Sequence, residues 1–512
     1  MQILFNQAIR YRRFLFSCLI ALLCFSSLLL PKGVAVDTSL LSTQQLASQA
    51  LSNDIPKTAM GSINSHFSQI DAQTITVYAE ASESKSTPTL TQVSIKTSEK
   101  TGKWLSFLIL LLGLVFTLAV ALMPRKFISI ISEKAQIKAN FIKIVAFVVL
   151  SRLVLLLIGY ISYAVLDRTN TIYFRIDYFD FVLKSFNAGD VSWYLQIARL
   201  GYENRPFSLD RQANWAFYPL WPTIIKLGSF FFNHPLIVGL FLSNLFFLLG
   251  LIYLYRLVLI DFDEEIAYST TLLAVIFPSS YFCSRPGPEA LFLFLVIISL
   301  FYAKKQQWIL AGFLSSLGVL TRLQGILLIF PLLWLYYKQY KKSKSHDSKA
   351  FSLFLMPLSL FSFMLYMYFL TGNFFANFSI QKAWDSSAAY PFLAMINYLF
   401  DPVIVSYYGW DLSIISFVFI LLLVLLTITL ITYRGIPLEY IIYTLVSAYI
   451  IVSRNNIQGS LRFMIPIFPL YLALALLIQN KQMGRDLLFF VFISLQTFYF
   501  LSFLHYYNWA AT

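Results

Sequence analysis

Charged residues are scarce in this chain, and their scarcity decides its class. Only 12% of the 512 residues are charged, whereas 58% are hydrophobic and the mean hydropathy is +0.71. Soluble globular domains lie far from these values. Apolar runs recur from Trp104 to Leu504 with short polar breaks, which leaves no separate soluble catalytic domain. We therefore predict an all-α polytopic membrane protein, a bundle of about 11–13 transmembrane helices whose chemistry takes place in loops.

Cysteine and histidine are also few, and their spacing excludes a metal centre. The scattered residues are Cys18, Cys24, Cys283, His66, His234, His346 and His505. None of them has the spacing of metal ligands, so we predict no disulfide, no metal and no cofactor. Asp261-Phe262-Asp263 has the form of a metal site for a nucleotide-sugar diphosphate. We discount it, because it lies in a short loop predicted to be cytoplasmic and the chain has no doubly wound α/β domain.

The net charge of +14 has an orienting role in this context. In a soluble protein such a charge would suggest nucleic acid as a partner, but here most lysines and arginines lie in short loops between apolar runs. We expect no nucleic-acid partner. The positive-inside rule predicts that Lys126, Lys342 and Arg485 face the cytoplasm, and that Asp190, Gln381 and Arg454 lie on the outer side. The lysines that mark the central cytoplasmic loop are Lys338, Lys341, Lys342, Lys344 and Lys349.

The first 139 residues are predicted to precede the core. Residues 1–35 join a basic start to an apolar run and are a signal peptide or an N-terminal signal anchor. Residues 36–102 are rich in Ser, Thr, Gln and Ala, which predicts a disordered extracytoplasmic tether. Residues 103–139 form an additional transmembrane helix and a cytoplasmic loop, and residues 140–512 form the core.

Spans of the core are predicted from the apolar runs. They lie at 142–165, 235–257, 266–282, 289–303, 307–320, 323–337, 350–370, 411–432, 436–452, 463–479 and 486–504. In this path 215–233 lies in the membrane interface and Arg322 lies near the outer surface. In a rival path 215–233 crosses and 307–337 is one long helix with Arg322 at its centre. We favour the first path, because an unpaired arginine at a helix centre costs about 2.5–3.5 kcal/mol.

The outward loop after 142–165 contains Asp190 at the start of an amphipathic, aromatic-rich helical stretch. Two interpretations are open. Asp190 caps the helix, a role worth roughly 0.5–2 kcal/mol, or it is a general base that deprotonates an acceptor hydroxyl. Asp177 and Asp180 in the same loop are spare candidates for the base.

Six short motifs follow one another along residues 140–480. They are Asp190 with Trp193-Tyr194-Leu195 and Gly201-Tyr202, Phe217-Tyr218-Pro219-Leu220-Trp221-Pro222, Phe277-Pro278 with Glu289-Ala290-Leu291-Phe292, Ala311-Gly312 with Leu320-Thr321-Arg322 and Gly325, Gln381 with Trp384, and Arg462-Phe463 with Pro466 and Pro469. Their order resembles the PIG-V family, the second mannosyltransferase of GPI-anchor assembly and its bacterial relatives, within the GT-C glycosyltransferases. Gly189, where the family has Trp, and Arg285-Pro286-Gly287-Pro288, where it has a polar run, depart from the pattern.

The resemblance implies a GT-C-like bundle and an inverting transfer of a sugar, mannose, with Asp190 as general base. The donor is a polyprenyl- or dolichyl-phosphate sugar and the acceptor is an extracytoplasmic glycan or glycolipid. Membrane lipid is the remaining expected partner. The expected location is the plasma membrane in a bacterium and the endoplasmic reticulum membrane in a eukaryote, with the active site on the extracytoplasmic or lumenal side.

Substrate-binding residues are expected in the same motifs. Arg322 and Arg462, with Arg454, suit the oxygens of the donor phosphate, and their other interpretation is that of interfacial anchors. Glu289 binds sugar or pairs with Arg285. Gln381, Trp384 and Trp193 are also expected to bind substrate. The tryptophans that could stack on a sugar or form an interfacial belt are Trp193, Trp215, Trp221 and Trp384.

Two other functions remain open at this point. A transporter or flippase of lipid-linked sugars would also have many helices, intramembrane charge and outer aromatic residues. A structural partner in a larger assembly is the third alternative. In a eukaryotic host, Asn377-Phe378-Ser379 would also be a glycosylation sequon on the outer face.

Overall fold

The computed structural model describes residues 133–166, 182–183, 185–232, 234–384, 387–400, 406–407, 410–411, 413–457 and 459–506. The predicted leader, tether and first span lie outside the described residues, as do Asp177 and Asp180. All of the described residues belong to one compact unit, 104–512.

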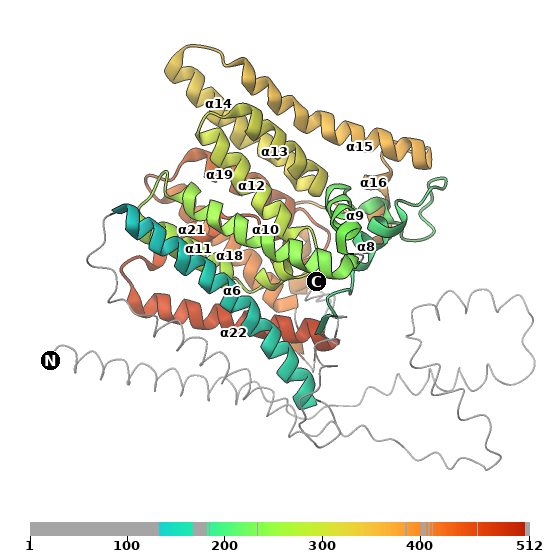
Figure 1. The fold of residues 1–512 in the computed structure, drawn as a ribbon, viewed down its shortest axis with the longest axis horizontal. Coiled ribbons are helices and arrows are strands. Elements are labelled where there is room, and N and C mark those ends of the chain that lie inside the picture. The colour runs from blue at the N-terminus through green and yellow to red at the C-terminus, as the bar shows by residue number, and fades with distance from the viewer. Residues whose placement is uncertain are drawn as a thin grey trace, which may run out of the picture. The chain divides into compact units, whose positions relative to one another are not determined.

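Helices make up 79% of the described residues, which confirms the predicted all-α polytopic membrane protein (Figure 1). The described residues contain one small hairpin, β1 (Ser406–Tyr407) with β2 (Trp410–Asp411). Five helical stretches are long and apolar enough to cross a membrane. They lie in α6 (Glu133–Leu166), α10 (Pro235–Val258), η6 (Ser348–Phe354) with α15 (Leu355–Thr371), α18 (Ser413–Thr432) and α22 (Gln482–Tyr506).

The other elements are shorter, so the total of about 11–13 crossings stays a prediction. The longer ones among them are α8 (Asp190–Leu200), α9 (Leu220–Phe232), α11 (Glu264–Ile276), α12 (Glu289–Lys304), α13 (Trp308–Thr321), α14 (Ile329–Ser343), α17 (Leu393–Phe400), α19 (Leu438–Val452) and α21 (Pro469–Ile478). The shortest are η3 (Asn214–Ala216), η4 (Ser280–Ser284), η5 (Leu323–Leu328), α16 (Ala376–Ser379), η7 (Ile380–Trp384) and α20 (Ser460–Met464). Their bounds follow the predicted segments closely in most of the core.

Proline shortens two of the predicted spans. The span predicted at 266–282 ends as a helix at Ile276, because Phe277 precedes Pro278 and is held in an extended conformation with ψ 134°. The span predicted at 463–479 divides into α20 and α21 around Pro466 and Pro469. Both breaks place backbone polar groups in turns that side chains can reach.

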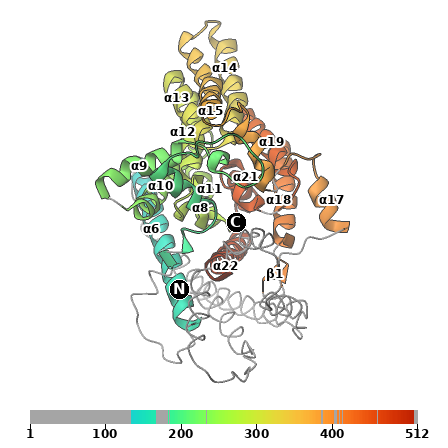
Figure 2. The same cartoon turned by 90° about the vertical axis from the view of Figure 1, so that its right-hand side faces the viewer.

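The helices are stacked in a fixed order around the centre of the bundle. Figure 2 shows α9 and α18 on opposite sides, with α10, α11 and α21 between them, and each neighbouring pair in this order is in contact. Helix α12 packs between α10 and α13, and only Phe294, Tyr302 and Lys304 among its residues are partly exposed. It has a carboxylate, Glu289, at its first position and an ammonium group, Lys304, at its last. At 1.5 Å per residue these ends are about 22 Å apart.

The helix predicted by the rival path at 307–337 is wrong, because the chain breaks at Arg322. Helix α13 ends at Thr321, and Arg322 is extended with φ −154° and ψ 146° before η5 begins. The turn packs so closely that a Cβ on Gly325 would lie 2.3 Å from the carbonyl carbon of Gly318. Only glycine fits at this position. Arg322 therefore lies just after the end of α13 and not at the centre of a long helix.

Candidate functional site

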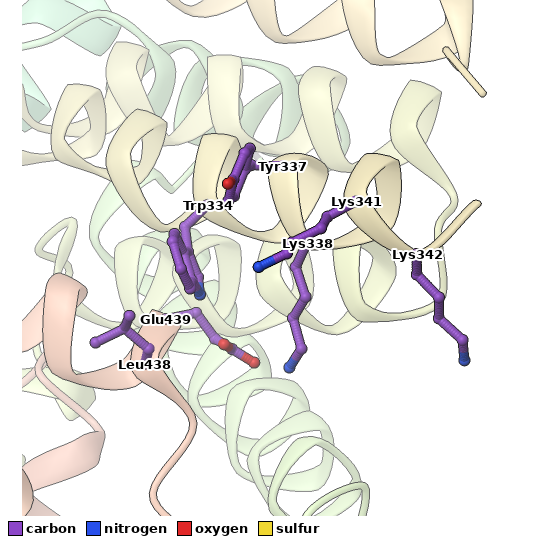
Figure 3. A pocket seen from close by; sticks show the side chains of 7 residues that line it. All are labelled: Trp334, Tyr337, Lys338, Lys341, Lys342, Leu438 and Glu439. Atoms are coloured by element: carbon purple, nitrogen blue, oxygen red, sulfur yellow. The ribbon is translucent and has the colours of Figure 1, made fainter. Parts of the chain in front are cut away.

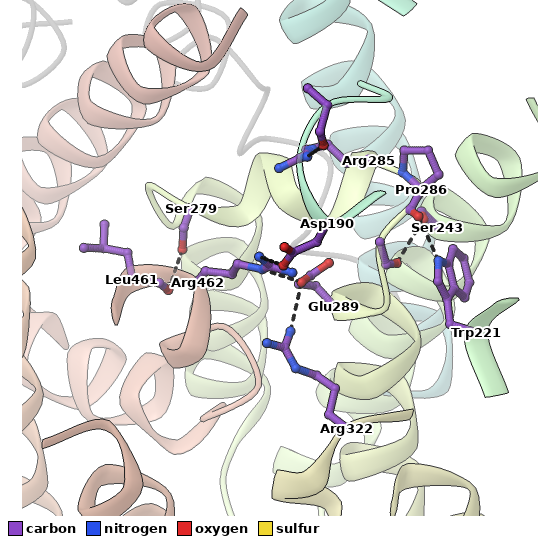
Figure 4. Close-up of polar contacts among 12 residues, drawn as sticks. Asp190, Trp221, Ser243, Ser279, Arg285, Pro286, Glu289, Arg322, Leu461 and Arg462 are labelled. Carbon is purple, nitrogen blue, oxygen red and sulfur yellow. Dashed lines mark hydrogen bonds and ion pairs between the residues drawn. The ribbon is translucent and has the colours of Figure 1, made fainter. Parts of the chain in front are cut away.

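Four charged side chains from distant parts of the sequence meet in one chain of ion pairs (Figure 4). Arg462 on α20 donates through Nη1 to Oδ2 of Asp190, at 2.5 Å, and through Nε to Oε1 of Glu289, at 2.6 Å. Arg322 donates through Nη1 to the same Glu289 oxygen, at 2.8 Å. All four residues were expected in the site from the sequence, and the structure brings them together.

The four side chains differ in how far they are exposed. The side chain of Glu289 is 2% exposed and those of Arg462 and Arg322 are 11% and 12% exposed, whereas that of Asp190 is 31% exposed. A buried carboxylate requires paired and hydrogen-bonded partners, and Glu289 has two arginines. Asp190 is therefore the member of the network that is most accessible to a substrate.

Asp190 begins α8 but does not cap it. The N-cap residue is Gly189, with φ 62°, and no side-chain hydrogen bond caps the helix. The carboxylate of Asp190 instead accepts from Arg462. The interpretation of Asp190 as a helix cap is therefore wrong, although a negative charge in the first turn also suits the helix dipole.

Arg285 holds the backbone just before Asp190. Its Nη2 donates to the carbonyl oxygen of Ala188 at 2.6 Å, and its guanidinium lies 4.1 Å from the ring centroid of Phe503. Glu289 forms its ion pairs with the two arginines of the network, so the alternative in which it pairs with Arg285 is wrong.

The segment between α11 and α12 is braced by several side chains. Trp221 Nε1 donates to the carbonyl oxygen of Pro286 at 2.8 Å, and Ser279 Oγ donates to that of Leu461, the residue before Arg462, at 2.8 Å. Gly287 in this segment packs against the Glu289 carboxylate, because a Cβ there would lie 2.2 Å from Oε2 of Glu289 and would displace it. The segment therefore fixes Glu289 relative to Arg462.

Arg152 supports the same segment and was missed by the sequence analysis. It is buried in α6 and donates through Nη2 to the carbonyl oxygen of Val275, at 2.9 Å, and through Nη1 to that of Ser280, at 3.1 Å. The available signal was an arginine inside the apolar run 142–165, since a charged residue within a membrane span marks a structural or functional contact.

A third arginine borders the network. The guanidinium of Arg454 lies 4.5 Å from the ring centroid of Phe463, and that of Arg322 lies 5.1 Å from the same ring. Burial, together with the charges of Arg462 and Arg322, lowers the pKa of Arg454 to about 10. Arg454 therefore stays charged at pH 7 and adds a third guanidinium group beside the network. Guanidinium groups gathered in this way suit an anionic ligand.

The remaining predicted substrate-binding residues lie in other surroundings. Gln381 Nε2 donates to the carbonyl oxygen of Ala216 at 3.3 Å, which ties η7 to η3. Trp193 is partly buried and stacks on Phe217, with ring centroids 6.0 Å apart. Trp384 ends η7, and its side chain is outside what the structure describes.

Two of the tryptophans and the sequon asparagine are inaccessible. Trp215 and Trp221 are each 0% exposed, so neither stacks on a sugar and neither belongs to an interfacial belt. Asn377 is 2% exposed and its Nδ2 donates to the hydroxyl of Tyr218 at 3.2 Å. The folded protein does not expose this sequon for modification.

The Asp-x-Asp sequence has structural contacts at the other end of α12. Asp261 accepts from Lys304 at 2.7 Å and from the hydroxyl of Tyr440 at 2.7 Å, and Asp263 caps α11 by accepting from the backbone of Ile266 at 2.9 Å. Within the described ranges no three His, Cys, Asp or Glu side chains are grouped as metal ligands.

Comparisons with known proteins point to a glycosyltransferase. Residues 217–367 match a family described as dolichyl-phosphate-mannose-protein mannosyltransferase, and this segment contains Glu289 and Arg322. No curated protein matches the chain. The family match supports a membrane glycosyltransferase, and it covers only part of the chain.

Among solved structures, the chain is similar to the oligosaccharyltransferase of Archaeoglobus fulgidus. With a tethered acceptor peptide, that protein gives 12% identity and a TM-score of 0.35 over 70% of this chain and 54% of that one. With an inhibitory peptide and a dolichol-phosphate it gives 12% identity and a TM-score of 0.36 over 70% and 55%. The chain therefore spans about half the length of the oligosaccharyltransferase.

Proposed function

We propose that this protein transfers a sugar, mannose, from a polyprenyl- or dolichyl-phosphate sugar to an extracytoplasmic glycan or glycolipid, with inversion. The observation that carries the proposal is the chain of ion pairs from Asp190 through Arg462 and Glu289 to Arg322. It joins an accessible carboxylate to arginines that suit a phosphate. The family match of residues 217–367 and the ordered motifs of the PIG-V type support the same donor class.

Asp190 is the general base in this mechanism. As the acceptor hydroxyl attacks the anomeric carbon, its proton passes to the Asp190 carboxylate and the bond between that carbon and the phosphate oxygen breaks. The phosphate leaves with the electron pair of the broken bond. Attack on the face opposite the phosphate inverts the anomeric centre.

Arg322, Arg454 and Arg462 stabilise the leaving phosphate. A guanidinium carries five N–H donors; Glu289 takes one from Arg322 and one from Arg462, and Asp190 takes a second from Arg462. Further donors of these guanidinium groups suit phosphate oxygens, where charge develops in the transition state. Glu289 keeps the two guanidinium groups together and balances part of their charge in the absence of the donor.

Arg462 connects donor binding to the availability of the base. In the structure its Nη1 donates to the Asp190 carboxylate. When the donor phosphate binds, Arg462 exchanges this bond for a bond with a phosphate oxygen. The Asp190 oxygen is then released to accept a hydrogen bond from the acceptor hydroxyl.

In the test, purified full-length protein is mixed with a polyprenyl-phosphate mannose and candidate acceptors in the presence of EDTA. Product is detected by mass spectrometry. The wild type is expected to form product and Asp190→Asn to form none while eluting as a folded protein. Asp210→Asn, an exposed acidic residue of the same outer segment, is the matched control and should stay active. Product from Asp190→Asn would remove this residue from the base role. Translocation of the lipid-linked sugar in vesicles without any product would favour a flippase.

A further inference from the structure

A charged pocket lies between α14 and α19, and none of the four residues of the ion-pair network lines it. It is a cavity of about 370 Å³, within the range of roughly 300–1,000 Å³ that small-molecule sites occupy. It is lined by Trp334, Tyr337, Lys338, Lys341, Lys342, Leu438 and Glu439. Figure 3 shows Trp334 and Lys338 projecting from α14 towards Leu438 and Glu439 at the start of α19. The pocket thus combines an aromatic wall with three ammonium groups.

The charges around this pocket favour an anion. Glu439 is 0% exposed and is neutralised by Lys304, whose Nζ lies 2.6 Å from its carboxylate. Lys304 also pairs with Asp261 at 2.7 Å. Together with the three lysines of α14, four ammonium groups face two carboxylates, a net charge of +2. An anion that enters the pocket therefore meets the lysines of α14 while Glu439 is already compensated.

The surface next to the pocket is apolar. On α14, Phe330 is 51% exposed and Leu333 is 48% exposed, and both share a helix face with Tyr337 and Lys341. On α19, Leu445 is 45% exposed. Along α14 the same face is thus first aliphatic and aromatic and then basic. This order matches the acyl chains, the interface and the headgroup of a phospholipid.

We propose that this pocket binds the phosphate headgroup of an anionic phospholipid, with its acyl chains along the exposed faces of α14 and α19. Lysines close to a membrane edge attract anionic headgroups, and basic pockets between helices hold them specifically. Along α14, Trp334 and Tyr337 lie between the apolar Phe330 and Leu333 and the basic Lys341 and Lys342, an order that suits the preference of aromatic side chains for the membrane interface. The apolar flank distinguishes a lipid from a soluble phosphate, which would gain nothing from it.

The test uses full-length protein in phosphatidylcholine nanodiscs that contain a trace of photoreactive phosphatidylglycerol or, separately, photoreactive phosphatidylcholine. Labelled peptides are mapped by mass spectrometry. The phosphatidylglycerol probe should label the peptides of α14 and α19 about fivefold or more above the phosphatidylcholine probe. The triple variant Lys338→Gln, Lys341→Gln, Lys342→Gln should reduce that labelling to the phosphatidylcholine level.

Two controls make the result specific. The triple variant Lys305→Gln, Lys344→Gln, Lys349→Gln removes the same charge outside the pocket and should label like the wild type. Leu438→Trp fills the cavity without changing its charge and should lose the labelling. Equal loss in both triple variants, or full labelling of Leu438→Trp, would overturn the proposal. Displacement of the probe by inorganic phosphate at constant ionic strength would also overturn it, in favour of a soluble phosphate.

Discussion

At the scale of single residues, Arg462 is the most informative side chain because it contacts both carboxylates of the network. Arg462→Lys keeps the charge but loses the planar fork, and Arg462→Ala loses both. We expect turnover to fall in the lysine variant and further in the alanine variant, by roughly tenfold to somewhat over a hundredfold, since a charge-assisted hydrogen bond is worth about 1.5–3 kcal/mol. Activity per folded molecule is the measurement.

The control for this series is Arg211, which is 67% exposed in the segment between α8 and η3. Its lysine and alanine variants should keep their turnover. If Arg462 were only an interfacial anchor, Arg462→Lys would be fully active and Arg462→Ala would lose expression and not turnover.

Variants of Glu289 and Asp190 should differ in how far they lower the stability of the fold. Glu289→Gln removes the carboxylate that pairs with Arg322 and leaves Arg462 with Asp190 alone, a change expected to destabilise the fold by about 3–5 kcal/mol. Asp190→Asn should cost much less stability, because its side chain is 31% exposed. Thermal unfolding in detergent measures both variants. A lower melting temperature for Asp190→Asn than for Glu289→Gln would contradict this assignment of roles.

The sequence named the four charged residues of the network but not the contacts among them. Motif order indicated Asp190, Glu289, Arg322 and Arg462, whereas the choice of Arg462 as the partner of both carboxylates depends on packing between α8, α12 and α20. The sequence also did not indicate that the tryptophans are buried. The burial of Trp221 depends on the turn at Pro286, whose carbonyl oxygen accepts from its indole.

At the scale of elements, the segment between α11 and α12 determines where Glu289 lies. In Gly287→Ala the new methyl group would lie 2.2 Å from Oε2 of Glu289, so the carboxylate has to move. A displacement of about 1 Å at a reacting centre can lower the rate by as much as a hundredfold. We expect expression close to wild type with strongly reduced turnover. Steady-state kinetics and elution volume measure the two effects.

The matched control is Gly484→Ala, where the nearest side-chain atom would be 3.7 Å from the new Cβ. Equal activity of the two alanine variants would show that the close packing of Gly287 against Glu289 has no role in turnover.

Element positions were predictable to the extent that apolar runs set them. The predicted span 235–257 corresponds to α10 and the predicted 289–303 to α12. Breaks were harder to predict, because the end of α11 at Ile276 depends on how Pro278 constrains the residue before it. The break at Arg322 followed from the energetic cost of an unpaired arginine in lipid.

At the scale of the whole molecule, the predicted topology places the Glu289 end of α12 and the Lys304 end of α12 on opposite sides of the membrane. In a chain without Cys18, Cys24 and Cys283, we expect an impermeant thiol reagent to label Asp210→Cys from the outer side and Lys342→Cys from the cytoplasmic side. Intact and permeabilised cells provide the comparison. Labelling of both positions from the same side would refute the predicted topology.

The class of the molecule was evident from composition, whereas the number of crossings was not. A run of about 20 apolar residues spans the hydrocarbon core, and α12, with 16 residues, falls short of that length. Such helices are covered by neighbouring protein on most faces, so their number cannot be counted from hydropathy alone.

The ion-pair network also has a consequence for biogenesis. A ribosome produces Asp190, Glu289 and Arg322 before Arg462, because Arg462 follows Arg322 by 140 positions. Until α20 emerges, Glu289 has one of its two arginines and Asp190 lacks Arg462. The network is therefore completed only after α20 has been synthesised. A chain that stops before Arg462 carries carboxylates without their full set of partners, a feature by which quality-control proteases can distinguish it from a chain that contains α20.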